Sequence, residues 1–348
     1  MFDLTTIQKN KFKIAAGIFL VLVLIFINLA ILGKIQSKSK KTSEQPQSPK
    51  IPTIYQNPAQ KQPKRFDFST LNQIAYPQNL PVYTAQKNQI DLSKAQAIAA
   101  KFSFTGEPSK VINSTADGTQ FSWFDKNRIL AISQTTIRFD DQTQNSSNSL
   151  AEEDLKNKAS DFINSLPLIG SGLVLNDKKT AYYAYSNSKL ISASSFADSQ
   201  YVQFSFDRNL SNNPIYNSAL NPSYLTISIK KDGNINQLYT KIFSDFTANG
   251  QYPLKTLDEA KKEIENGQGK IVNTFMPDKN GQALQLYQLQ PNDISIAKFN
   301  NVALAYFLPV STSENIVPIF VFTGDFLTYS NQTGKIVLYL PAIQTSQP

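Results

Sequence analysis

The chain contains neither cysteine nor histidine among its 348 residues. Without cysteine, disulfides cannot stabilise the fold, and thiol catalysis and cysteine zinc sites are excluded. Without histidine, the chain lacks the side chain most often used for proton transfer near neutral pH, which is also the commonest metal ligand. Serine–histidine triads and histidine zinc sites are therefore excluded. We expect a protein that is not an enzyme and that has no cofactor, no metal and no catalytic residues.

Charged side chains are also scarce, at 17% of the residues, although the net charge is +8. Much of the positive excess stands near the N-terminus, where it flanks an apolar run and fills the segment that follows. Attraction to anionic lipid headgroups or cell-wall polymers explains this placement better than contact with a duplex, so we expect no nucleic-acid partner. The residues concerned are Lys9, Lys11, Lys13, Lys34, Lys38, Lys40, Lys41, Lys50, Lys61, Lys64 and Arg65.

The apolar run extends from Ile14 to Gly33 without a charge, and Asn28 is its one strongly polar member. Its length matches the roughly 20 residues that cross about 30 Å of hydrocarbon. A cleaved signal peptide is the alternative, but its apolar region is usually about 7 to 15 residues long and ends in a small-x-small cleavage site. The sequence therefore predicts a retained transmembrane helix over residues 14–33, which anchors the protein in the lipid bilayer.

Lysines stand on both sides of this span, so the positive-inside rule does not decide its orientation. Because the N-terminal segment, residues 1–13, is short and the rest of the chain is poor in charge, we expect the N-terminus inside the cell and the C-terminal body outside the membrane. Residues 34–65 are rich in Lys, Pro, Ser and Gln, which predicts a disordered, semi-rigid tether. Both a passive spacer and a proline-rich docking segment remain open for it.

Three later segments begin with a hydroxyl residue followed three positions on by Glu or Gln, the pattern of a helical capping box. Apolar residues at helical spacing follow each of them. The pairs are Ser93 with Gln96, before Ala95, Ile98, Ala99 and Phe102; Ser149 with Glu152, before Leu155, Ala159, Phe162 and Ile163; and Thr256 with Glu259, before Ala260, Ile264 and a helix end at Gly267.

Short runs typical of strands follow each helix, with turn residues between them. This order predicts an α+β fold of antiparallel β-meanders, each covered by a helix, in two lobes at residues 66–250 and 251–348; the first lobe could hold two repeats. The expected strands are 121–124, 129–139, 201–206, 224–229, 235–243, 284–289, 302–308, 316–322 and 336–340, with turns at Asp117-Gly118, Asp232-Gly233, Asn280-Gly281 and Thr333-Gly334.

Parts of this pattern resemble a known family, the YycH/YycI-type accessory proteins. Those proteins are single-pass extracytoplasmic regulators of a cell-wall-sensing histidine kinase, built from repeats related in shape to PepSY domains. The resemblance covers residues 90–340 as layout; it implies PepSY-like repeats and a partner role, and it carries over no catalytic residue. The stretches that resemble the family are Tyr252–Ala260, Gly267–Gly269, Val302–Tyr306 and Val317–Phe322 for the last repeat, and Tyr201–Phe206, Asn213–Tyr216, Leu225–Ile229 and Asp232-Gly233 for the repeat before it.

Several short motifs suggest chemistry and are better explained structurally. Ser186 with Lys189 and Ser228 with Lys231 have the Ser-x-x-Lys spacing of penicillin-interacting enzymes, but the first pair lies in a polar loop and the second in a strand, whereas the motif needs a helix. Asp278 opens a calcium-loop pattern that lacks its glutamate. Carboxylates at 152–154 fit the first turn of a helix, and Asp140-Asp141 is expected to be a solvated strand exit.

Aromatic side chains offer the one candidate contact surface. Tyr182, Tyr183 and Tyr185 form one cluster, and Trp123 with Phe124 a second. Because alternate strand residues face opposite sides, one aromatic in each group is expected to be exposed, and exposed aromatics suit peptide or glycan partners. Ordinary core packing is the alternative explanation for both groups. We place Tyr306, Phe320 and Phe322 in the core.

These features favour a membrane-anchored, extracytoplasmic, non-catalytic regulatory or protein-interaction module. The resemblance implies that its partner could be a cell-envelope sensor kinase, and in any case another envelope or membrane protein. A cell-wall or glycan-binding protein is the first alternative. An envelope hydrolase that uses Asp or Glu is the second.

Overall fold

The computed structural model describes residues 63–114, 118–143, 148–169, 172–186, 189–216, 223–275, 293–309 and 315–344. Internal contacts divide the chain into two units, residues 1–48 and 49–348, and every described residue belongs to the second. The predicted transmembrane span at 14–33 and nearly all of the tether therefore lie outside the described residues. Within them, no helix combines the length and the apolar character needed to cross a bilayer.

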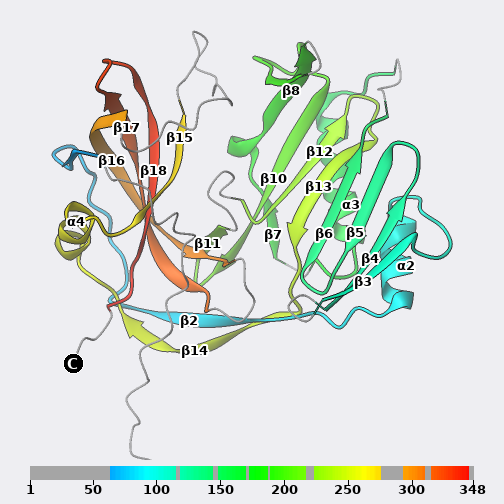
Figure 1. The fold of residues 1–348 in the computed structure, drawn as a ribbon, viewed down its shortest axis with the longest axis horizontal. Coiled ribbons are helices and arrows are strands. Elements are labelled where there is room, and N and C mark those ends of the chain that lie inside the picture. Colours follow the sequence, from blue (N-terminus) through cyan, green and yellow to red (C-terminus); the bar gives the residue numbers. More distant parts are fainter. Residues whose placement is uncertain are drawn as a thin grey trace, which may run out of the picture. The chain divides into compact units, whose positions relative to one another are not determined.

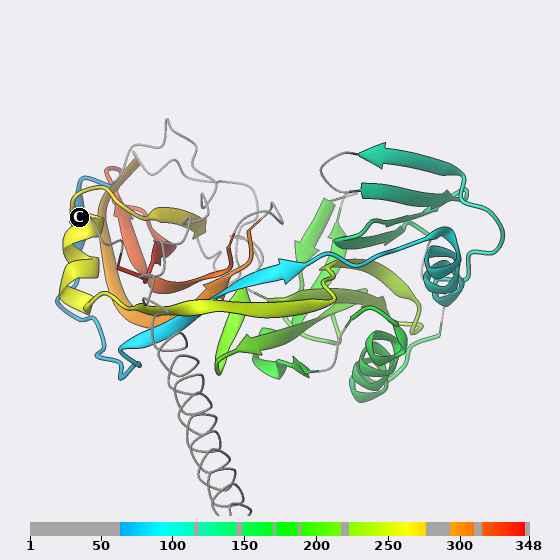
Figure 2. The ribbon, with the colours of Figure 1, turned by 90° about the horizontal axis from the view of Figure 1, so that it is seen from below.

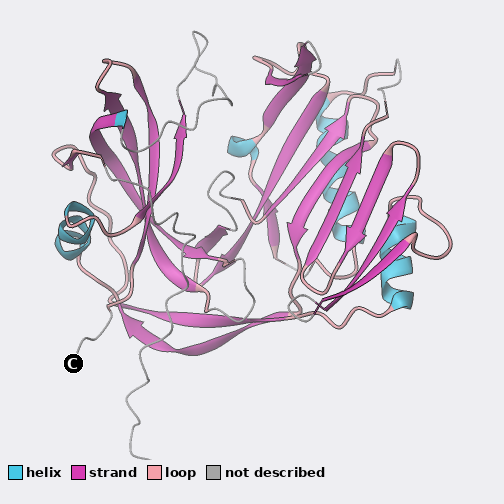
Figure 3. Ribbon diagram, in the orientation of Figure 1, coloured by secondary structure: helices cyan, strands magenta, loops and turns pink. Residues whose placement is uncertain are grey.

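Strands make up most of the described fold (Figure 3). The helices in this part of the chain are α2 (Leu92–Lys101), α3 (Glu152–Ser165), α4 (Leu257–Glu265) and the 3-10 turn η1 (Asp177–Lys179). The strands are β1 (Arg65–Asp67), β2 (Asn79–Gln86), β3 (Lys110–Ser114), β4 (Gly118–Phe124), β5 (Arg128–Ile132), β6 (Thr136–Asp141), β7 (Leu173–Leu175), β8 (Ala181–Ser186), β9 (Lys189–Ser192), β10 (Tyr201–Leu210), β11 (Asn213–Tyr216), β12 (Leu225–Lys230), β13 (Ile235–Lys241), β14 (Asp245–Pro253), β15 (Lys270–Phe275), β16 (Ile294–Phe307), β17 (Val317–Thr328) and β18 (Thr333–Pro341).

Sixteen of these strands pair into one mixed sheet with the central order β15-β18-β17-β16-β11-β10-β12-β13-β6-β5-β4-β3 (Figure 1). Most neighbours are antiparallel, but β16 pairs in parallel with both β1 and β11. Strands β2 and β14 form a separate two-stranded ribbon. The predicted fold of separate antiparallel meanders, each covered by a helix, is therefore wrong, because strands from both halves of the chain share a single mixed sheet.

Buried apolar residues form two clusters. The first joins α2 and α3 to the inward side chains of β4, β5, β6, β10, β12 and β13. The second joins α4 to β15–β18 and also takes in residues 66–82 from the other end of the described chain. There, the Phe66 and Phe68 rings stack on Phe299, with centroids 6.3 and 5.5 Å apart. The N-terminal and C-terminal parts of the described chain thus share this second cluster.

The helices occupy the predicted segments, and one of their three predicted caps is correct. Thr256 Oγ1 accepts from the Glu259 amide and Glu259 Oε2 from the Thr256 amide, which confirms the capping box of α4. Helix α2 is instead capped by Asp91, whose Oδ1 accepts from the Lys94 amide, and α3 starts after Ala151 without a side-chain cap. The predicted apolar faces are confirmed by the burial of Ala95, Ile98, Ala99, Phe102, Leu155, Ala159, Ile163, Ala260 and Ile264.

The turns show where local patterns mislead. Asp232-Gly233 does form a hairpin turn, where Gly233 has a φ of 88°. The run predicted as one strand over 129–139 folds as the β5–β6 hairpin, and Thr333-Gly334 lies inside β18 and not in a turn. The chain reverses before it, at residues 329–332. The predicted Asn280-Gly281 turn, the strand at 284–289 and the calcium-like Asp278 lie outside the described residues.

Candidate functional site

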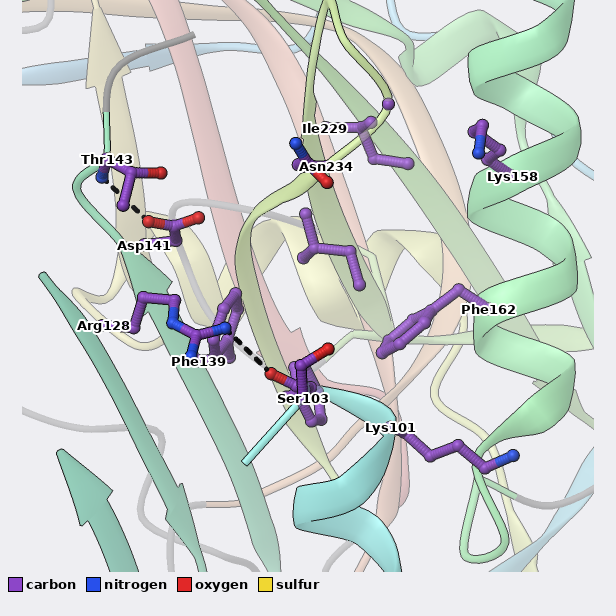
Figure 4. Close-up of a pocket in the computed structure, with 13 residues that line it drawn as sticks. Lys101, Ser103, Arg128, Phe139, Asp141, Thr143, Lys158, Phe162, Ile229 and Asn234 are labelled. Carbon is purple, nitrogen blue, oxygen red and sulfur yellow. Dashed lines mark hydrogen bonds between the residues drawn. The ribbon is translucent and has the colours of Figure 1, made fainter. Parts of the chain in front are cut away.

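A pocket of about 480 Å³ opens between the C-terminal end of α2, one face of α3 and the sheet (Figure 4). The pocket combines aromatic side chains with charged ones, which is typical of sites that bind small molecules. Its lining residues are Lys101, Phe102, Ser103, Arg128, Phe139, Asp141, Thr143, Lys158, Phe162, Ile229, Gly233, Asn234 and Ile235.

Three phenylalanines from three different elements form the floor of this pocket. The Phe102 ring lies 4.7 Å from that of Phe139 and packs edge-on against Phe162 at 5.0 Å between centroids. Figure 4 shows Phe162 projecting from α3 toward the strand that carries Phe139. Helical spacing places Phe162 one turn beyond Lys158 on the same face of α3, so this face contributes both an apolar and a cationic group to the pocket.

The carboxylate in the pocket, that of Asp141, is neutralised by a buried lysine. Lys230 Nζ lies 2.8 Å from Asp141 Oδ2 and also donates to the backbone oxygen of Thr143, while the Thr143 amide donates to Asp141 Oδ1. Burial alone would raise the pKa of Asp141, but the hydrogen bonds from Lys230 and Thr143 outweigh it, and the pKa lies below its ordinary value. The prediction that Asp140-Asp141 is a solvated strand exit is thus wrong for Asp141, whose side chain is 8% exposed.

The guanidinium in the pocket, that of Arg128, is also held in place. It forms an ion pair with Asp125, donates to the Phe102 carbonyl at 3.3 Å and lies 4.7 Å from the centroid of the Phe104 ring. The hydrogen bond from Arg128 is the leading reason why the pKa of Asp125 is lowered. Within the described residues, neither Lys101 nor Lys158 has an acidic partner. These two ammonium groups are therefore the available charges of the pocket.

The three tyrosines of the predicted contact surface lie in different environments, because alternate residues of a strand face opposite sides. Tyr182 on β8 faces α3, where its hydroxyl donates to Glu152 Oε1 at 2.7 Å; this hydrogen bond, with burial, raises the pKa of Tyr182 to about 12. Tyr183 is half-buried, and burial raises its pKa. Tyr185 is 50% exposed and packs edge-on against Tyr201 at 5.5 Å. Of the three tyrosines, Tyr185 is the one available to a partner.

Trp123, by contrast, belongs to the core. Its side chain is 2% exposed, and its indole nitrogen donates to the Gly106 carbonyl at 3.3 Å. The prediction that Trp123 is a contact residue is wrong, because its side chain points to the helix-covered side of β4. The exposed member of the pair is the neighbouring Phe124, at 47%.

Phe124 follows the buried Trp123 on β4, so strand alternation places it on the face of the sheet opposite α2 and α3. Figure 2 shows both helices on one side of these strands, and the other face is turned toward the viewer in Figure 1. We call this surface the open face and define it by Phe124 on β4, Ile129 on β5 and Tyr239 on β13. Phe124 and Ile129 are directly paired across β4 and β5, and Ile129 is 42% exposed. The inward neighbours on these strands, such as Trp123, Leu130 and Leu238, are buried against the helices.

The sheet ends beside this surface at β3, which pairs with β4 and with no other described strand. Both central side chains of β3, Val111 and Ile112, are exposed. An edge with uncovered backbone groups and exposed β-branched residues is unusual, because soluble proteins normally protect such edges with charge, proline or a covering segment. The open face and β3 thus form a continuous exposed margin of the sheet.

Neither Ser-x-x-Lys pair lies on a helix, as that motif requires. Lys231 Nζ lies 3.8 Å from the centroid of the Phe196 ring, and Ser228 is buried on β12. Ser186 and Lys189 pair across the β8–β9 hairpin, and no helix carries them. Glu152, Glu153 and Asp154 occupy the first turn of α3, as predicted. In the described ranges, Asp and Glu side chains form no group of three or more that could hold a metal ion.

Comparison with known proteins gives no family assignment. No family model matches the chain, and no curated protein matches it. Among solved structures, an uncharacterized protein from Eubacterium rectale is similar over 81% of this chain and 89% of its own, with 12% identity and a TM-score of 0.46. The YpeB C-terminal domain of Bacillus megaterium is similar over 74% of this chain and 100% of its own, with 12% identity and a TM-score of 0.34.

No match supports the YycH/YycI-type proteins specifically. Both likenesses are too low to assign a fold or an activity. The functional argument therefore rests on the residues of this chain.

Proposed function

We propose that this protein is a membrane-anchored, extracytoplasmic, non-catalytic module that acts by binding another envelope or membrane protein. The observation that carries the proposal is the exposed margin of the sheet, formed by the open face and strand β3. Its apolar side chains are concentrated on a few neighbouring strands, and exposed apolar surface of this kind marks interaction sites. The location and the anchor rest on the apolar run at 14–33 and on the tether after it.

The geometry of the margin favours an extended segment as the partner's contact. A strand added beside β3 would form backbone hydrogen bonds with the edge, and its alternate side chains would meet Ile112 or Val111. Lys110 on β3 is an exposed positive charge beside this margin, whereas Arg138 on the open face, with 64% of its side chain exposed, is paired with Asp140. A partner strand that alternates apolar and acidic residues would complement this margin.

The kind of partner follows from the anchor. A body held to the bilayer by a tether meets other membrane proteins at high effective concentration, so a weak edge contact is sufficient for regulation. The family resemblance implies a cell-envelope sensor kinase as the partner class. In its more specific form, the proposal is that the partner is such a kinase.

Site-specific photocrosslinking of the full-length protein in its own cells tests the proposal. A photoreactive phenylalanine analogue at position 124 or 239 should crosslink to a membrane protein, and the same analogue at Tyr329, which is 61% exposed after β17, should not. Ile129→Asp should abolish the crosslink from position 124, since it places a charge beside that side chain. Crosslinks of equal yield from all three positions, or a body that external protease cannot reach in intact cells, would overturn the proposal.

A cell-wall polymer is the alternative partner, favoured by the exposed Tyr185 and its edge-on contact with Tyr201. Exposed aromatic rings of this kind can pack on sugar faces. Cosedimentation with purified cell wall at two salt concentrations separates the alternatives. Salt-sensitive binding that Tyr185→Ala removes and Ile129→Asp leaves intact supports the polymer, and the reverse pattern supports the protein partner.

A further inference from the structure

The pocket between α2 and α3 divides into an apolar floor and a cationic rim. The floor consists of the packed rings of Phe102, Phe139 and Phe162, extended by Ile229 and Ile235. The rim carries Lys101 at the end of α2 and Lys158 on α3, both exposed. The volume of the whole pocket, about 480 Å³, falls within the range of small-molecule sites.

The net charge of the lining determines which ligands it favours. Among its ionised groups, Asp141 is compensated by Lys230, and Arg128 is compensated by Asp125. Lys101 and Lys158 therefore remain as uncompensated positive charges within the described residues, so the potential of the pocket is positive and a cationic ligand is disfavoured. A ligand that satisfies both parts of the pocket has an anionic head and an apolar body.

We propose that this pocket binds a small anionic amphiphile, a carboxylate attached to an alkyl chain or an aromatic ring. The apolar body would lie against the phenylalanine floor, and the carboxylate would meet Lys158. Figure 4 shows the Lys101 ammonium pointing away from Phe162, so Lys101 would reach the ligand only after rotation about its side-chain bonds. Lys158 is thus the principal anion partner and Lys101 the secondary one.

Lys158 is held close to the pocket by its neighbours. A Cβ placed on Gly233 would lie 2.9 Å from Lys158 Cδ, so the absence of a side chain at 233 leaves room for the aliphatic part of Lys158 to cross the hairpin turn. Gly233 has a left-handed φ of 88° as well, which suits glycine at this turn. The turn thereby positions a cationic group and also forms part of the pocket wall.

Two sources could supply such a carboxylate, a free fatty acid or the apolar C-terminal residue of a peptide. Octanoate and N-acetyl-phenylalanine represent them as probes. The full-length protein is irradiated with a diazirine-bearing form of each probe, and the labelled peptides are mapped by mass spectrometry. Labelling of peptides that contain residues 101–103 or 158–162, displaced by the unlabelled probe, is the expected result for at least one of them.

Competition with uncharged and shorter analogues tests both parts of the pocket. Octanamide should displace the octanoate probe roughly fivefold less well, because it lacks the charge that meets an exposed lysine. Each methylene removed from the chain should weaken displacement about fourfold while the chain still lies in the pocket. Equal displacement by octanoate and octanamide would overturn the proposal.

Variants then connect binding to the pocket. Lys158→Gln should weaken labelling about fivefold. Asn234→Trp should abolish it, because Asn234 is exposed at the mouth and its side chain makes no hydrogen bond within the described residues, so a large ring there fills the pocket without removing core packing. Lys262→Gln, on α4, is the matched control with the same change in net charge and should label as the unaltered protein does. Normal labelling of Asn234→Trp, with a native circular dichroism spectrum, would rule the pocket out for that probe.

Discussion

Lys230 Nζ lies 2.8 Å from Oδ2 of Asp141, and the two side chains are only 1% and 8% exposed although 89 residues separate them in the chain. Strand β13 lies between β12 and β6 in the sheet, so this ion pair joins two strands that are not neighbours. It also fixes the wall of the pocket, because Asp141 and Thr143 line it. The pair therefore connects the stability of the sheet to the geometry of the site.

Breaking this pair from one side should destabilise the protein strongly. Lys230→Met leaves a buried carboxylate without its cation, and a loss of about 3–5 kcal/mol in the free energy of unfolding is expected. Lys335→Met is the control, since its pair with Asp325 is about half exposed and should be worth less than about 1 kcal/mol. Urea unfolding followed by the fluorescence of Trp123, the single tryptophan, measures both. Similar losses of unfolding free energy for the two variants would contradict the expected difference between the buried pair and the exposed pair.

The same pair predicts a pH dependence at the acid end. The pKa of Asp141 is lowered in the folded protein, so its ionised form contributes stability above the unfolded pKa of about 3.9, and this contribution is lost as the pH falls through the lower folded pKa. The difference in unfolding free energy between the unaltered protein and Asp141→Asn should therefore be constant from about pH 5 to 8 and shrink below about pH 4. A difference that changed mainly between pH 6 and 8 would point to another group.

Tyr182 should reveal its hydrogen bond to Glu152 at the alkaline end. Its pKa is raised to about 12, so the contribution of the neutral phenol is fully present below about pH 10 and is lost as the pH rises through about 12. Tyr182→Phe should cost about 1 kcal/mol at neutral pH and remove a late step from the ultraviolet titration of the tyrosines. Tyr185→Phe, at an exposed position, should leave stability within about 0.5 kcal/mol.

The start of α2 distinguishes the cap that the structure shows from the cap that the sequence predicts. Asp91→Ala removes the acceptor for the Lys94 amide and should cost about 1 kcal/mol. Ser93→Ala should be neutral or slightly stabilising, because Ser93 lies inside the helix, where alanine is the better helix former. Thr256→Ala, at the confirmed capping box of α4, should match Asp91→Ala in thermal unfolding. A larger loss for Ser93→Ala than for Asp91→Ala would contradict the observed cap.

Gly324 should tolerate no side chain. It stands opposite Phe299 at a bulge between β16 and β17, where an added Cβ would overlap the Lys298 carbonyl oxygen. Gly324→Ala should therefore destabilise by about 3 kcal/mol, since both backbones would have to shift. The Cβ added by Gly106→Ala meets open space, so only the left-handed φ of 81° destabilises this variant, by about 1–2 kcal/mol. Equal thermal shifts for these two variants would contradict the close approach.

Helix positions and the turn at Gly233 were predictable because their signals are local. The apolar spacing of Leu155, Ala159 and Ile163 depends on neighbours within two helical turns, and the Thr256–Glu259 cap depends on neighbours three residues apart. Local signals gave the wrong structure where a segment fitted two structures equally well. Ser93 and Asp91 are both good caps, and the alternation over 129–139 fits a single strand as well as a hairpin.

Strand pairing was beyond such reasoning because each pair depends on residues far away. Nothing near Ile215 indicates that it lies in parallel beside Tyr306, and this pairing is what turns the expected separate meanders into one mixed sheet. Likewise, the burial of Lys230 depends on a carboxylate 89 residues earlier, so a lysine at a strand end looks solvent-exposed in the sequence alone. The spacing of Lys158 and Phe162 along α3 was the one local hint of the pocket.

By itself, the sequence determined the three helices described, the capping box of α4, the Gly233 turn and the exclusion of cysteine and histidine chemistry, because each depends on residue identity or on spacing within a few positions. Only the tertiary structure decided that the two halves share a sheet, that Trp123 is buried while Phe124 is exposed, and that Lys158 lines one pocket with three phenylalanines. These features arise when segments that are distant in the sequence pack together and exclude water. The free energy of this burial depends on which segments meet, and no local sequence pattern indicates that.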